Sequence, residues 1–211
     1  PHRALLNEEF YIPEMKILEH QVSKIDRTEK FLFELKDGKM IETVLMRHGD
    51  RNTVCVSSQV GCAVKCSFCA TGINGFKRNL SFDEILSQIY YIQRALSKEG
   101  ETVRNVVFMG MGEPLLNLDN VMDTIKILIS EEGLNLSKRR ITISTSGIIP
   151  QIQRLIDEDL TVELALSLHA SSDEIRKEII PINDKYPIKD LMEVLKKYQA
   201  KSNRKITFEY I

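Results

Sequence analysis

The 211-residue chain lacks the features that would place it in a membrane or outside the cell. No run of apolar residues approaches the roughly eighteen needed for a spanning helix, and no signal-peptide pattern opens the sequence. The formal net charge is only −1, so bulk charge would not attract nucleic acid, and any RNA contact must come from local basic patches. Hydrophobic residues make up 43% of the chain, which is enough for a globular domain with a substantial core.

Cysteine is scarce and unevenly distributed. All four cysteines lie at or before Cys69, and three of them form a C-x3-C-x2-C pattern as Cys62, Cys66 and Cys69. No fourth cysteine or histidine follows at ligand distance. Two disulfides are an alternative, but cysteines packed this closely make poor bridge geometry and nothing suggests secretion. Free, clustered thiols indicate the reducing environment of the cytoplasm, where we expect this protein.

The cysteine spacing predicts a [4Fe–4S] cluster. Such a cluster normally takes one thiolate per iron, so three thiolates from Cys62, Cys66 and Cys69 leave one iron open to another ligand. A structural zinc site requires four N or S ligands in tetrahedral geometry, and the four histidines of the chain lie at no suitable spacing. A non-catalytic iron–sulfur or zinc-binding module is therefore kept as the alternative from another functional class.

The pattern of strands and helices changes near residue 50. Three segments of β character precede it (17–25, 30–35 and 40–46), and Asp37-Gly38 is a hairpin signal between the last two. Beyond it, strands at 53–57, 105–109, 140–144, 162–168 and 205–211 alternate with helices near 81–98, 118–130, 149–157, 173–179 and 188–201. We predict an N-terminal extension with a small antiparallel sheet (1–49) and a main α/β domain (50–211).

Five βα-type strands with polar residues at their carboxyl ends predict a partial (β/α) barrel, whose sites gather at that face. An open doubly wound sheet is the alternative. Gly112 and Glu113 follow one strand, where glycine lets the backbone approach a ligand and the carboxylate can accept hydrogen bonds from an ammonium. Ser144 and the segment 167–169 end the next two strands. A single strand-end serine is often only a helix cap, but three such ends on one face indicate a binding site.

The cysteine motif, with Phe68 before its last cysteine, resembles the signature of radical S-adenosylmethionine (SAM) enzymes. Their fold is usually a six-stranded partial barrel, of which about five strands are expected here. In these enzymes the amino and carboxylate groups of SAM complete the open iron, and one electron cleaves the sulfonium to a 5′-deoxyadenosyl radical. The resemblance implies SAM contacts at Phe68, Gly112, Glu113, Ser144, Ser167, Leu168 and His169.

Six further segments resemble the RlmN/Cfr family of radical SAM methyltransferases, which modify adenines of ribosomal RNA. They lie at 55–62, 75–80, 109–117, 136–147, 167–170 and 180–183, and the likeness runs from about Ile41 to Ile211. The sequences just before Cys62 and just after Glu113 are more similar to RlmN than to Cfr. That resemblance implies methylation of adenine C2 in 23S rRNA and in tRNA through a methylcysteine intermediate. Cfr-type methylation at C8 is the alternative.

Two further catalytic residues are implied by the same resemblance. Cys55 matches a second catalytic cysteine, which helps to release the product by forming a disulfide with the methyl-carrying cysteine near the C-terminus of the family's proteins. Taken alone, Cys55 is more typical of a small buried strand residue than of a catalytic one. Glu42 matches a proposed proton acceptor.

The methyl-carrying cysteine has no counterpart here, since no cysteine follows Cys69, and the chain stops at Ile211 within a strand-like run. We expect a piece of a longer protein that cannot methylate RNA alone. Turnover of an adenine-containing rRNA fragment by this chain would contradict that expectation.

Partners follow from the same resemblance. We expect 23S rRNA and tRNA as substrates, an electron donor such as flavodoxin, and a monomeric enzyme with no membrane contact. Lys77 and Arg78, which follow the cysteine loop, are the basic residues predicted to touch RNA phosphates, although such groups often form only a solvated face.

Overall fold

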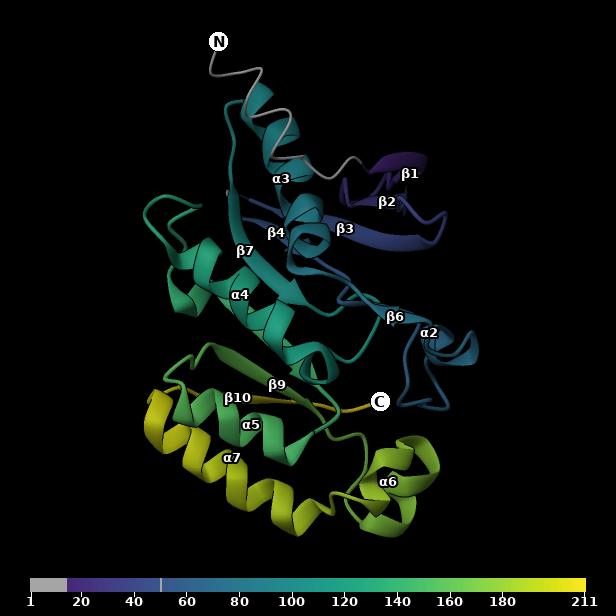
Figure 1. Cartoon of the computed structure of the whole chain (residues 1–211), viewed down its shortest axis with the longest axis vertical. Helices are drawn as coiled ribbons and strands as arrows, with labels where there is room; N and C mark the ends of the chain where they lie inside the picture. The colour runs from purple at the N-terminus through teal and green to yellow at the C-terminus, as the bar shows by residue number, and fades with distance from the viewer. Residues whose placement is uncertain (1–14, 50) are drawn as a thin grey trace.

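The computed structural model describes residues 15–49 and 51–211, and its framework is one mixed sheet of eight strands in the order β1-β2-β3-β4-β7-β8-β9-β10 (Figure 1). Four strands form an antiparallel meander: β1 (Lys16–Val22), β2 (Glu29–Glu34), β3 (Met40–His48) and β4 (Arg51–Cys55). The strand β4 also begins a parallel series that continues with β7 (Val103–Phe108), β8 (Ile141–Thr145), β9 (Glu163–Ser167) and β10 (Ile206–Glu209). The direction of the sheet therefore changes at β4.

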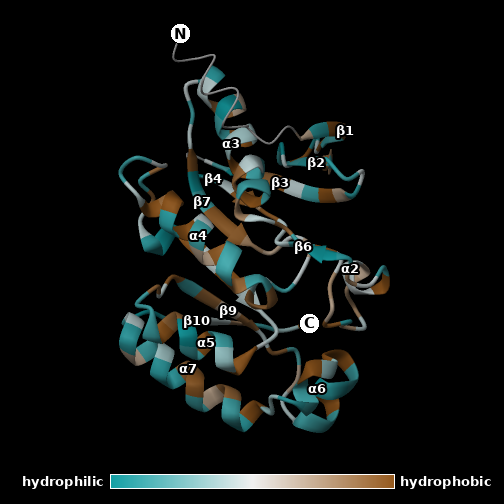
Figure 2. Cartoon of the chain, in the orientation of Figure 1, coloured by the Kyte–Doolittle hydropathy of each residue, from teal (hydrophilic) through white to brown (hydrophobic). Residues whose placement is uncertain are grey.

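Helices connect the parallel strands and supply the hydrophobic core. The longer ones are α3 (Phe82–Lys98), α4 (Leu118–Ile129), α5 (Ile149–Asp157), α6 (Asp173–Ile179) and α7 (Ile188–Ser202). Figure 2 shows that β7 and β9 are largely hydrophobic, whereas hydrophobic and hydrophilic residues alternate around the helices. A short helix α2 (Ala70–Ile73) and a two-stranded ribbon of β5 (Gln59–Val60) and β6 (Arg78–Asn79) surround the cysteine loop. Three 3-10 turns complete the described chain, at Pro114–Asn117, Lys138–Arg140 and Pro181–Asp184.

Strand alternation divides the sheet into a helix-covered face and an inner face. In β3, Ile41, Thr43 and Leu45 are buried, whereas Glu42 and Val44 between them are partly exposed. Thr43 Oγ1 donates a hydrogen bond to Gln88 Oε1 on α3 (2.8 Å), so the buried face lies against that helix. The inner face carries the more polar side chains and remains available for a ligand.

The predicted fold class is confirmed. Five parallel strands follow one another in chain order without reversal, which is the arrangement of a β/α barrel rather than of a doubly wound sheet. The capping box that predicted α3 is present, because the Ser81 backbone N–H donates to Glu84 Oε2 (3.1 Å) and the Ser81 side chain accepts from the backbone at Glu84. The first strand ends at Val22, before the predicted residue 25, because the Ser23 N–H bonds to Thr28 O (2.8 Å) in a turn.

The antiparallel segment is continuous with the main sheet, since Val44 of β3 pairs with Cys55 of β4. The proposed division into 1–49 and 50–211 stays a prediction, and its part before Met15 lies outside the described residues. Among the helices of the described chain, none combines the length and apolar character that a membrane crossing requires.

Candidate functional site

A cavity of about 360 Å³ lies at the carboxyl ends of the parallel strands. Its volume is at the lower end of the range for small-molecule sites. It brings together most of the residues that the sequence singled out, although they come from five separate segments. Its lining consists of Cys62, Val64, Cys66, Phe68, Cys69, Phe108, Met109, Gly110, Gly112, Glu113, Ser144, Thr145, Ser146, Ser167, His169 and Glu209.

The cysteine loop is held in place by backbone contacts at both ends. Gly61 starts the loop at φ +74, and a Cβ there would lie only 1.8 Å from Gly75 O, so only glycine fits. Further along, the Ser67 N–H donates to Ile179 O (2.9 Å), which ties the loop to the end of α6. The Cys69 N–H donates to Cys66 O (3.1 Å) within the loop itself. These contacts keep the three thiols on one wall of the cavity.

Burial disfavours the charged forms of two of the thiols, Cys62 and Cys66. Burial is the main cause that raises the pKa of Cys66 to about 12, and the neighbouring thiols of Cys62 and Cys69 contribute to this rise. Burial also raises the pKa of Cys62, and Glu113 adds to that effect. Iron binds thiolates, so cluster assembly must release these protons. All four cysteines are free in this structure.

The thiol arrangement suits a cluster better than a single ion. Within residues 15–49 and 51–211, no group of three His, Cys, Asp or Glu side chains converges closely enough to hold one metal ion. A zinc site requires that convergence, whereas a [4Fe–4S] cluster takes one thiolate on each iron and spreads them around its own volume. Cys62, Cys66 and Cys69 all line the cavity, so each could supply one thiolate to a [4Fe–4S] cluster there.

Glu113 is a buried anion without a cationic partner. Its side chain is almost fully buried, and no lysine, arginine or histidine of the described chain forms an ion pair with it. Its Oε1 accepts hydrogen bonds from Leu115 N–H (3.1 Å) and Thr145 Oγ1 (2.7 Å). Its Oε2 accepts from the Ser146 N–H and Oγ, both at 2.7 Å. Burial raises the pKa of Glu113, and a ligand ammonium would supply the missing positive charge.

The approach to Glu113 requires glycine at the preceding position. Gly112 has φ +101, and a Cβ there would lie 2.5 Å from Gln59 Cβ. Gln59 Oε1 accepts a hydrogen bond from the Glu113 N–H (2.9 Å), so the same glutamine both crowds Gly112 and fixes Glu113. Gly112 therefore allows the backbone to place Glu113 at the cavity.

Ser144 and Ser167 meet at a carboxylate that sequence reasoning missed. Glu209 Oε2 accepts hydrogen bonds from Ser144 Oγ (3.1 Å) and Ser167 Oγ (3.0 Å). The backbone O of Glu209 accepts from the N–H groups of Leu168 and His169 (both 3.1 Å). A signal was available, since Glu209 lies near the carboxyl end of the last predicted strand, where the other polar residues were found. Thr145 and Ser146 were also missed, although they directly follow Ser144.

His169 and Phe68 form one side of the cavity. Their rings make an edge-to-face contact with centroids 4.8 Å apart. His169 has φ +55, and its buried Nδ1 has no hydrogen-bond partner among the described residues. Burial lowers the pKa of His169, which favours the neutral ring. A polar ligand group could satisfy Nδ1. Leu168, also predicted as a SAM contact, packs partly buried against the core and its side chain does not line the cavity.

Cys55 and Glu42 lie on the inner face of the sheet, outside the cavity lining. Cys55 ends β4, and burial raises its pKa to about 11. Glu42 is two residues from Val44, the strand partner of Cys55, so alternation places it on the same face. The Glu42 carboxylate forms an ion pair with Lys30 (2.9 Å). The catalytic roles of Cys55 and Glu42 stay predictions.

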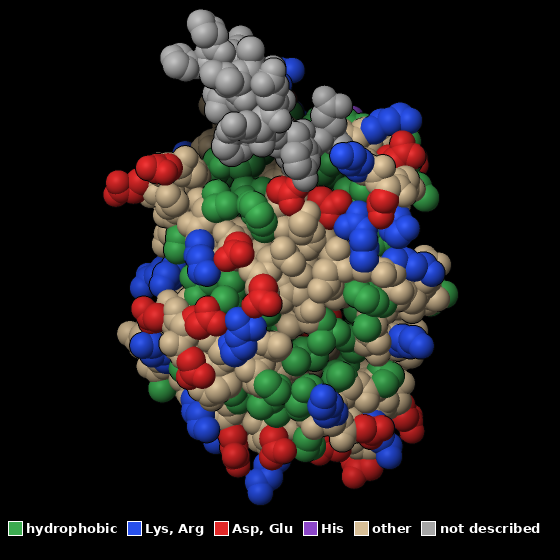
Figure 3. All heavy atoms as spheres, viewed as in Figure 1, with side chains coloured by type: hydrophobic (Ala, Val, Ile, Leu, Met, Phe, Trp, Pro, Cys, Tyr) green, Lys and Arg blue, Asp and Glu red, His purple; other side chains and the backbone are tan. Residues whose placement is uncertain are grey.

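Lys77 and Arg78 differ in their surroundings. The Arg78 guanidinium forms ion pairs with Asp37 (2.8 Å) and Glu84 (2.7 Å), so it links the β2–β3 turn to the start of α3. Lys77 is exposed. On the face drawn in Figure 3, Lys and Arg side chains are interspersed with Asp and Glu. RNA contact by Lys77 and Arg78 stays a prediction, and for Arg78 it would compete with two ion pairs.

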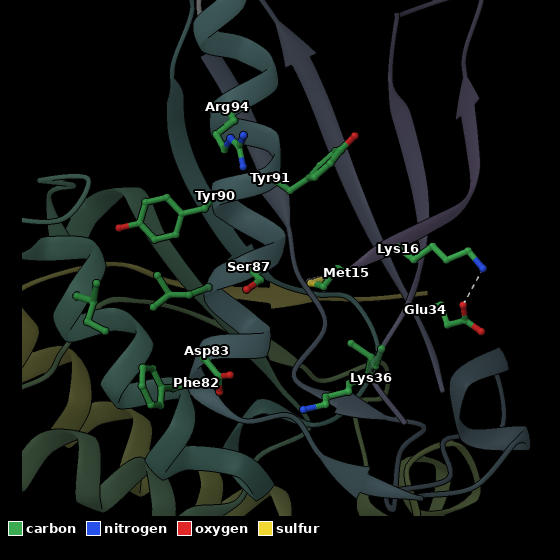
Figure 4. A pocket seen from close by; sticks show the side chains of 13 residues that line it. Met15, Lys16, Glu34, Lys36, Phe82, Asp83, Ser87, Tyr90, Tyr91 and Arg94 are labelled. Atoms are coloured by element: carbon green, nitrogen blue, oxygen red, sulfur yellow. Dashed lines mark hydrogen bonds and ion pairs between the residues drawn. The ribbon is translucent and has the colours of Figure 1, made fainter. Parts of the chain in front are cut away.

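A second, larger cavity of about 1160 Å³ lies elsewhere, beside α3 (Figure 4). Its lining includes Met15, Phe82, Tyr90 and Tyr91 but no cysteine or histidine, and it shares no residue with the cavity at the cysteine loop. Figure 4 shows the ion pair of Lys16 and Glu34 at its edge (3.2 Å). This cavity is the larger of the two, but the smaller one contains the three cysteines and Glu113, and we therefore take the smaller one as the candidate site.

A parallel β/α sheet with three thiols and a buried, cation-free glutamate around one cavity is the architecture of an enzyme that binds both an iron–sulfur cluster and SAM. The chain belongs to the radical SAM superfamily, whose family profile matches residues 56–210. This assignment confirms the two predicted cofactors, a [4Fe–4S] cluster and SAM.

Similar proteins narrow the position within the superfamily. The chain is 53% identical over its whole length to the probable dual-specificity RNA methyltransferase RlmN of Pseudothermotoga lettingae, covering 60% of that protein. It is 50% identical to the protein of the same name from Staphylococcus saprophyticus, over 99% of this chain and 57% of that one. These matches confirm the resemblance to the RlmN/Cfr family.

A solved structure agrees with the same assignment. The crystal structure of a radical SAM methyltransferase from Sphaerobacter thermophilus superposes with a TM-score of 0.94 at 45% identity. The superposition covers 99% of this chain and 61% of that one. The chain thus spans about three fifths of the length of the curated relatives it matches.

Proposed function

We propose that this chain is the core of an RNA methyltransferase that uses radical SAM chemistry to methylate C2 of an adenosine in 23S rRNA and in tRNA. The observation that carries the proposal is the single cavity that unites the three cysteines with Glu113 and the polar strand ends. The RlmN name of relatives about half identical to this chain supports C2 rather than C8 as the target.

Cys62, Cys66 and Cys69 would hold the cluster by one thiolate each. When bound, a [4Fe–4S] cluster together with SAM supplies one-electron cleavage of a sulfonium. The chain would position these groups at the wall of the cavity, where the three thiols are partly buried. An exposed cluster would be lost more easily than one held in this loop.

Glu113 would accept hydrogen bonds from the amino group of SAM and so gain the cation it lacks. The acceptors on the opposite strand ends, Ser144, Ser167 and Glu209, would bind the hydroxyl groups of the nucleoside. His169 and Phe68 would close the side of the site, with His169 Nδ1 offering one further polar contact.

Cys55 and Glu42 would act on the RNA side of the cofactors. The raised pKa of Cys55, about 11, keeps it as a thiol until product release. Its sulfur would then bond to the sulfur of a methyl-carrying cysteine that this chain lacks, while the bond from that sulfur to the product carbon breaks and this carbon takes the electron pair and a proton. Glu42 would accept a proton only after leaving Lys30. We further propose that the enzyme is a cytoplasmic monomer that receives electrons from a flavodoxin-type donor, and that Lys77 contributes to RNA binding.

Anaerobic reconstitution tests the core of the proposal. The chain is incubated with iron and sulfide, SAM is added, and a chemical reductant is supplied. We expect a brown protein whose absorption spectrum shifts with SAM and which releases 5′-deoxyadenosine. A colourless product with a mononuclear metal would contradict the proposal. Liquid chromatography of the nucleosides against 2- and 8-methyladenosine standards, with mass spectrometric detection, on rRNA modified by the full-length protein would then distinguish C2 from C8 methylation.

A further inference from the structure

Arg176 on α6 is a fully buried guanidinium that no carboxylate accompanies. Its four hydrogen bonds all reach neutral oxygens. Nε donates to Leu168 O (3.1 Å), Nη1 to Asn183 Oδ1 (2.8 Å), and Nη2 to both Ser146 O (2.7 Å) and Ser167 O (2.8 Å). The side chain therefore joins the ends of β8 and β9 to the turn after α6.

A buried cation without an anion is costly, and buried charges in proteins are normally paired. Arginine does not escape by losing its proton under ordinary conditions. Burial lowers the pKa of Arg176, whereas the charges of a Cys66 thiolate and of Asp173 would act in the opposite direction. The Asp173 carboxylate is instead engaged by Asn183 Nδ2 and the Ile188 N–H (both 2.8 Å).

Arg47, which has a structural role, differs from Arg176 in being paired with carboxylates. Arg47, also largely buried, forms ion pairs with Glu29 (2.9 Å), Glu99 (3.0 Å) and Glu101 (3.1 Å). Three carboxylates neutralise it within the chain. The direct hydrogen-bond partners of Arg176 are carbonyl oxygens alone, so its guanidinium forms no ion pair within the described chain.

Arg176 also lies between the two halves of the cavity. Its hydrogen bond holds the carbonyl of Ser146, and the N–H and Oγ of that same serine donate to Glu113. Three residues further along α6, Ile179 O accepts the hydrogen bond from Ser67 of the cysteine loop. One short helix thus contacts both the loop that carries the predicted cluster ligands and the strand ends predicted to bind SAM.

We propose that Arg176 is a positioning residue that couples the cluster to the SAM cavity. Its guanidinium serves as the buried counter-cation of the cysteine thiolates that hold the cluster, while its hydrogen bonds fix the ends of β8 and β9. This inference rests on the proposed function. The proposal also gives a role to the segment 180–183, because Asn183 in that segment accepts a hydrogen bond from the Arg176 guanidinium and orients it.

Four variants of the reconstituted chain test the proposal: Arg176→Met, Arg176→Lys, Asn183→Ala and the matched control Arg47→Met. Three quantities are measured: the midpoint potential of the cluster, the affinity for SAM from the spectral shift, and the gain in melting temperature on cluster insertion. Reduction adds negative charge to the cluster, so loss of a nearby cation makes reduction harder.

In Arg176→Met we expect a more negative potential, a smaller gain in melting temperature on cluster insertion, and SAM affinity lowered about tenfold or more, in line with loss of charge-assisted hydrogen bonds. Arg176→Lys keeps the charge but not the planar fork, so the potential stays near that of the wild type while SAM affinity falls. Asn183→Ala is expected to lower SAM affinity with the potential unchanged. Arg47→Met should lower stability and change neither cluster property.

A potential in Arg176→Met equal to that of the wild type, with SAM affinity no lower than in Arg47→Met, would overturn the proposal. If Arg176→Met does not fold, the lysine variant decides, and unchanged SAM affinity there would overturn it. Failure of the wild-type chain to take up iron and sulfide would refute the proposed function itself, and the assignment of Arg176 with it.

Discussion

The two ends of the sheet handle buried charge in opposite ways. Near the end of β3, Arg47 forms ion pairs with Glu29, Glu99 and Glu101, so its charge is paired within the chain. At the carboxyl ends of β8 and β9, Glu113 and Arg176 are buried without an ionic partner, separated by the single residue Ser146. The first arrangement stabilises the fold. The second leaves one anion and one cation to be completed by bound groups, and such local violations of folding rules mark functional sites.

The largest test of this comparison removes a cluster ligand. Cys66→Ser should abolish iron and sulfide uptake, because the open cluster site depends on all three thiolates. Cys55→Ser is the matched control, since Cys55 lies outside the cavity and should leave cluster content unchanged. Iron and sulfide analysis of both reconstituted proteins measures the effect. Equal loss in the two variants would mean that the cluster is held differently.

Local sequence signals were enough to predict most of the fold. Ser81 and Glu84 define the first turn of α3 through contacts within four residues, and α5 and α6 have the predicted bounds. The ribbon of β5 and β6 was missed because each strand has only two residues, too few for an alternation to be detected.

The cavity was harder to predict than the strands that frame it. Cys62, Cys66 and Cys69 were found because a motif places all three in one loop. Arg176 and Glu209 were missed because key partners lie far away in the chain: Ser146 is 30 residues from Arg176, and Ser144 is 65 residues from Glu209. Their importance arises from burial and from long-range contacts, neither of which local spacing reveals.

The second prediction concerns the junction of the two regions, where Cys55 ends β4. Burial raises its pKa from 9.0 to about 11, so at pH 8 its thiolate fraction should be about 100-fold below that of an unperturbed cysteine. Alkylation by iodoacetamide should slow by a similar factor. Mass spectrometry of the cysteine-containing peptides measures this rate, with the unfolded chain as control. Equal rates in the folded and unfolded chain would show that Cys55 is not shielded.

The third prediction neutralises the buried anion. Glu113→Gln should weaken SAM binding by roughly 10- to 100-fold, the usual range for losing a hydrogen bond to a charged group. Spectral titration of the reconstituted variant measures the affinity. Glu113→Asp keeps the charge but shortens the side chain, and it should retain more affinity than Glu113→Gln. The reverse order would argue against charge recognition.

The stabilities of the wild type and of Glu113→Gln should also depend differently on pH. Because the pKa of Glu113 is raised on folding above its ordinary 4.5, its contribution to stability is fully present below that pH and is lost as pH rises through the folded value. The stability of the wild type relative to Glu113→Gln should therefore decline with rising pH. Denaturant unfolding at several pH values would show it, and a difference that grows with pH would contradict the burial argument.

The fourth prediction moves to the paired end of the sheet. Arg47→Met should lower the free energy of unfolding by about 1.5–3 kcal/mol, because it leaves the largely buried Glu29 without a guanidinium and with only His20 as a side-chain partner. Urea unfolding of the metal-free chain measures the loss. If stability does not change, the ion pairs of Arg47 do not stabilise the fold, and the contrast with the unpaired charges at the cavity is wrong.

The smallest effects are expected at the basic pair near the ribbon. Arg78→Met should cost about 1 kcal/mol or less, since its ion pairs with Asp37 and Glu84 are partly exposed. Lys77→Met should leave stability within about 0.5 kcal/mol of the wild type. If Lys77 contacts RNA, only that variant lowers RNA affinity while the fold stays equally stable. Equal RNA affinity of the Lys77 variant and the wild type would remove it from the RNA interface.

The change of strand direction at β4 also has a consequence for the order of folding. Antiparallel neighbours such as Val44 and Cys55 are close in the chain, whereas the parallel pair of Ser167 and Glu209 must close a long loop. During synthesis the N-terminal meander can therefore form early, and the β9–β10 pair last. The cysteine loop emerges between these events. Its thiols would stay accessible to incoming iron until β10 pairs with β9 and completes the wall of the cavity.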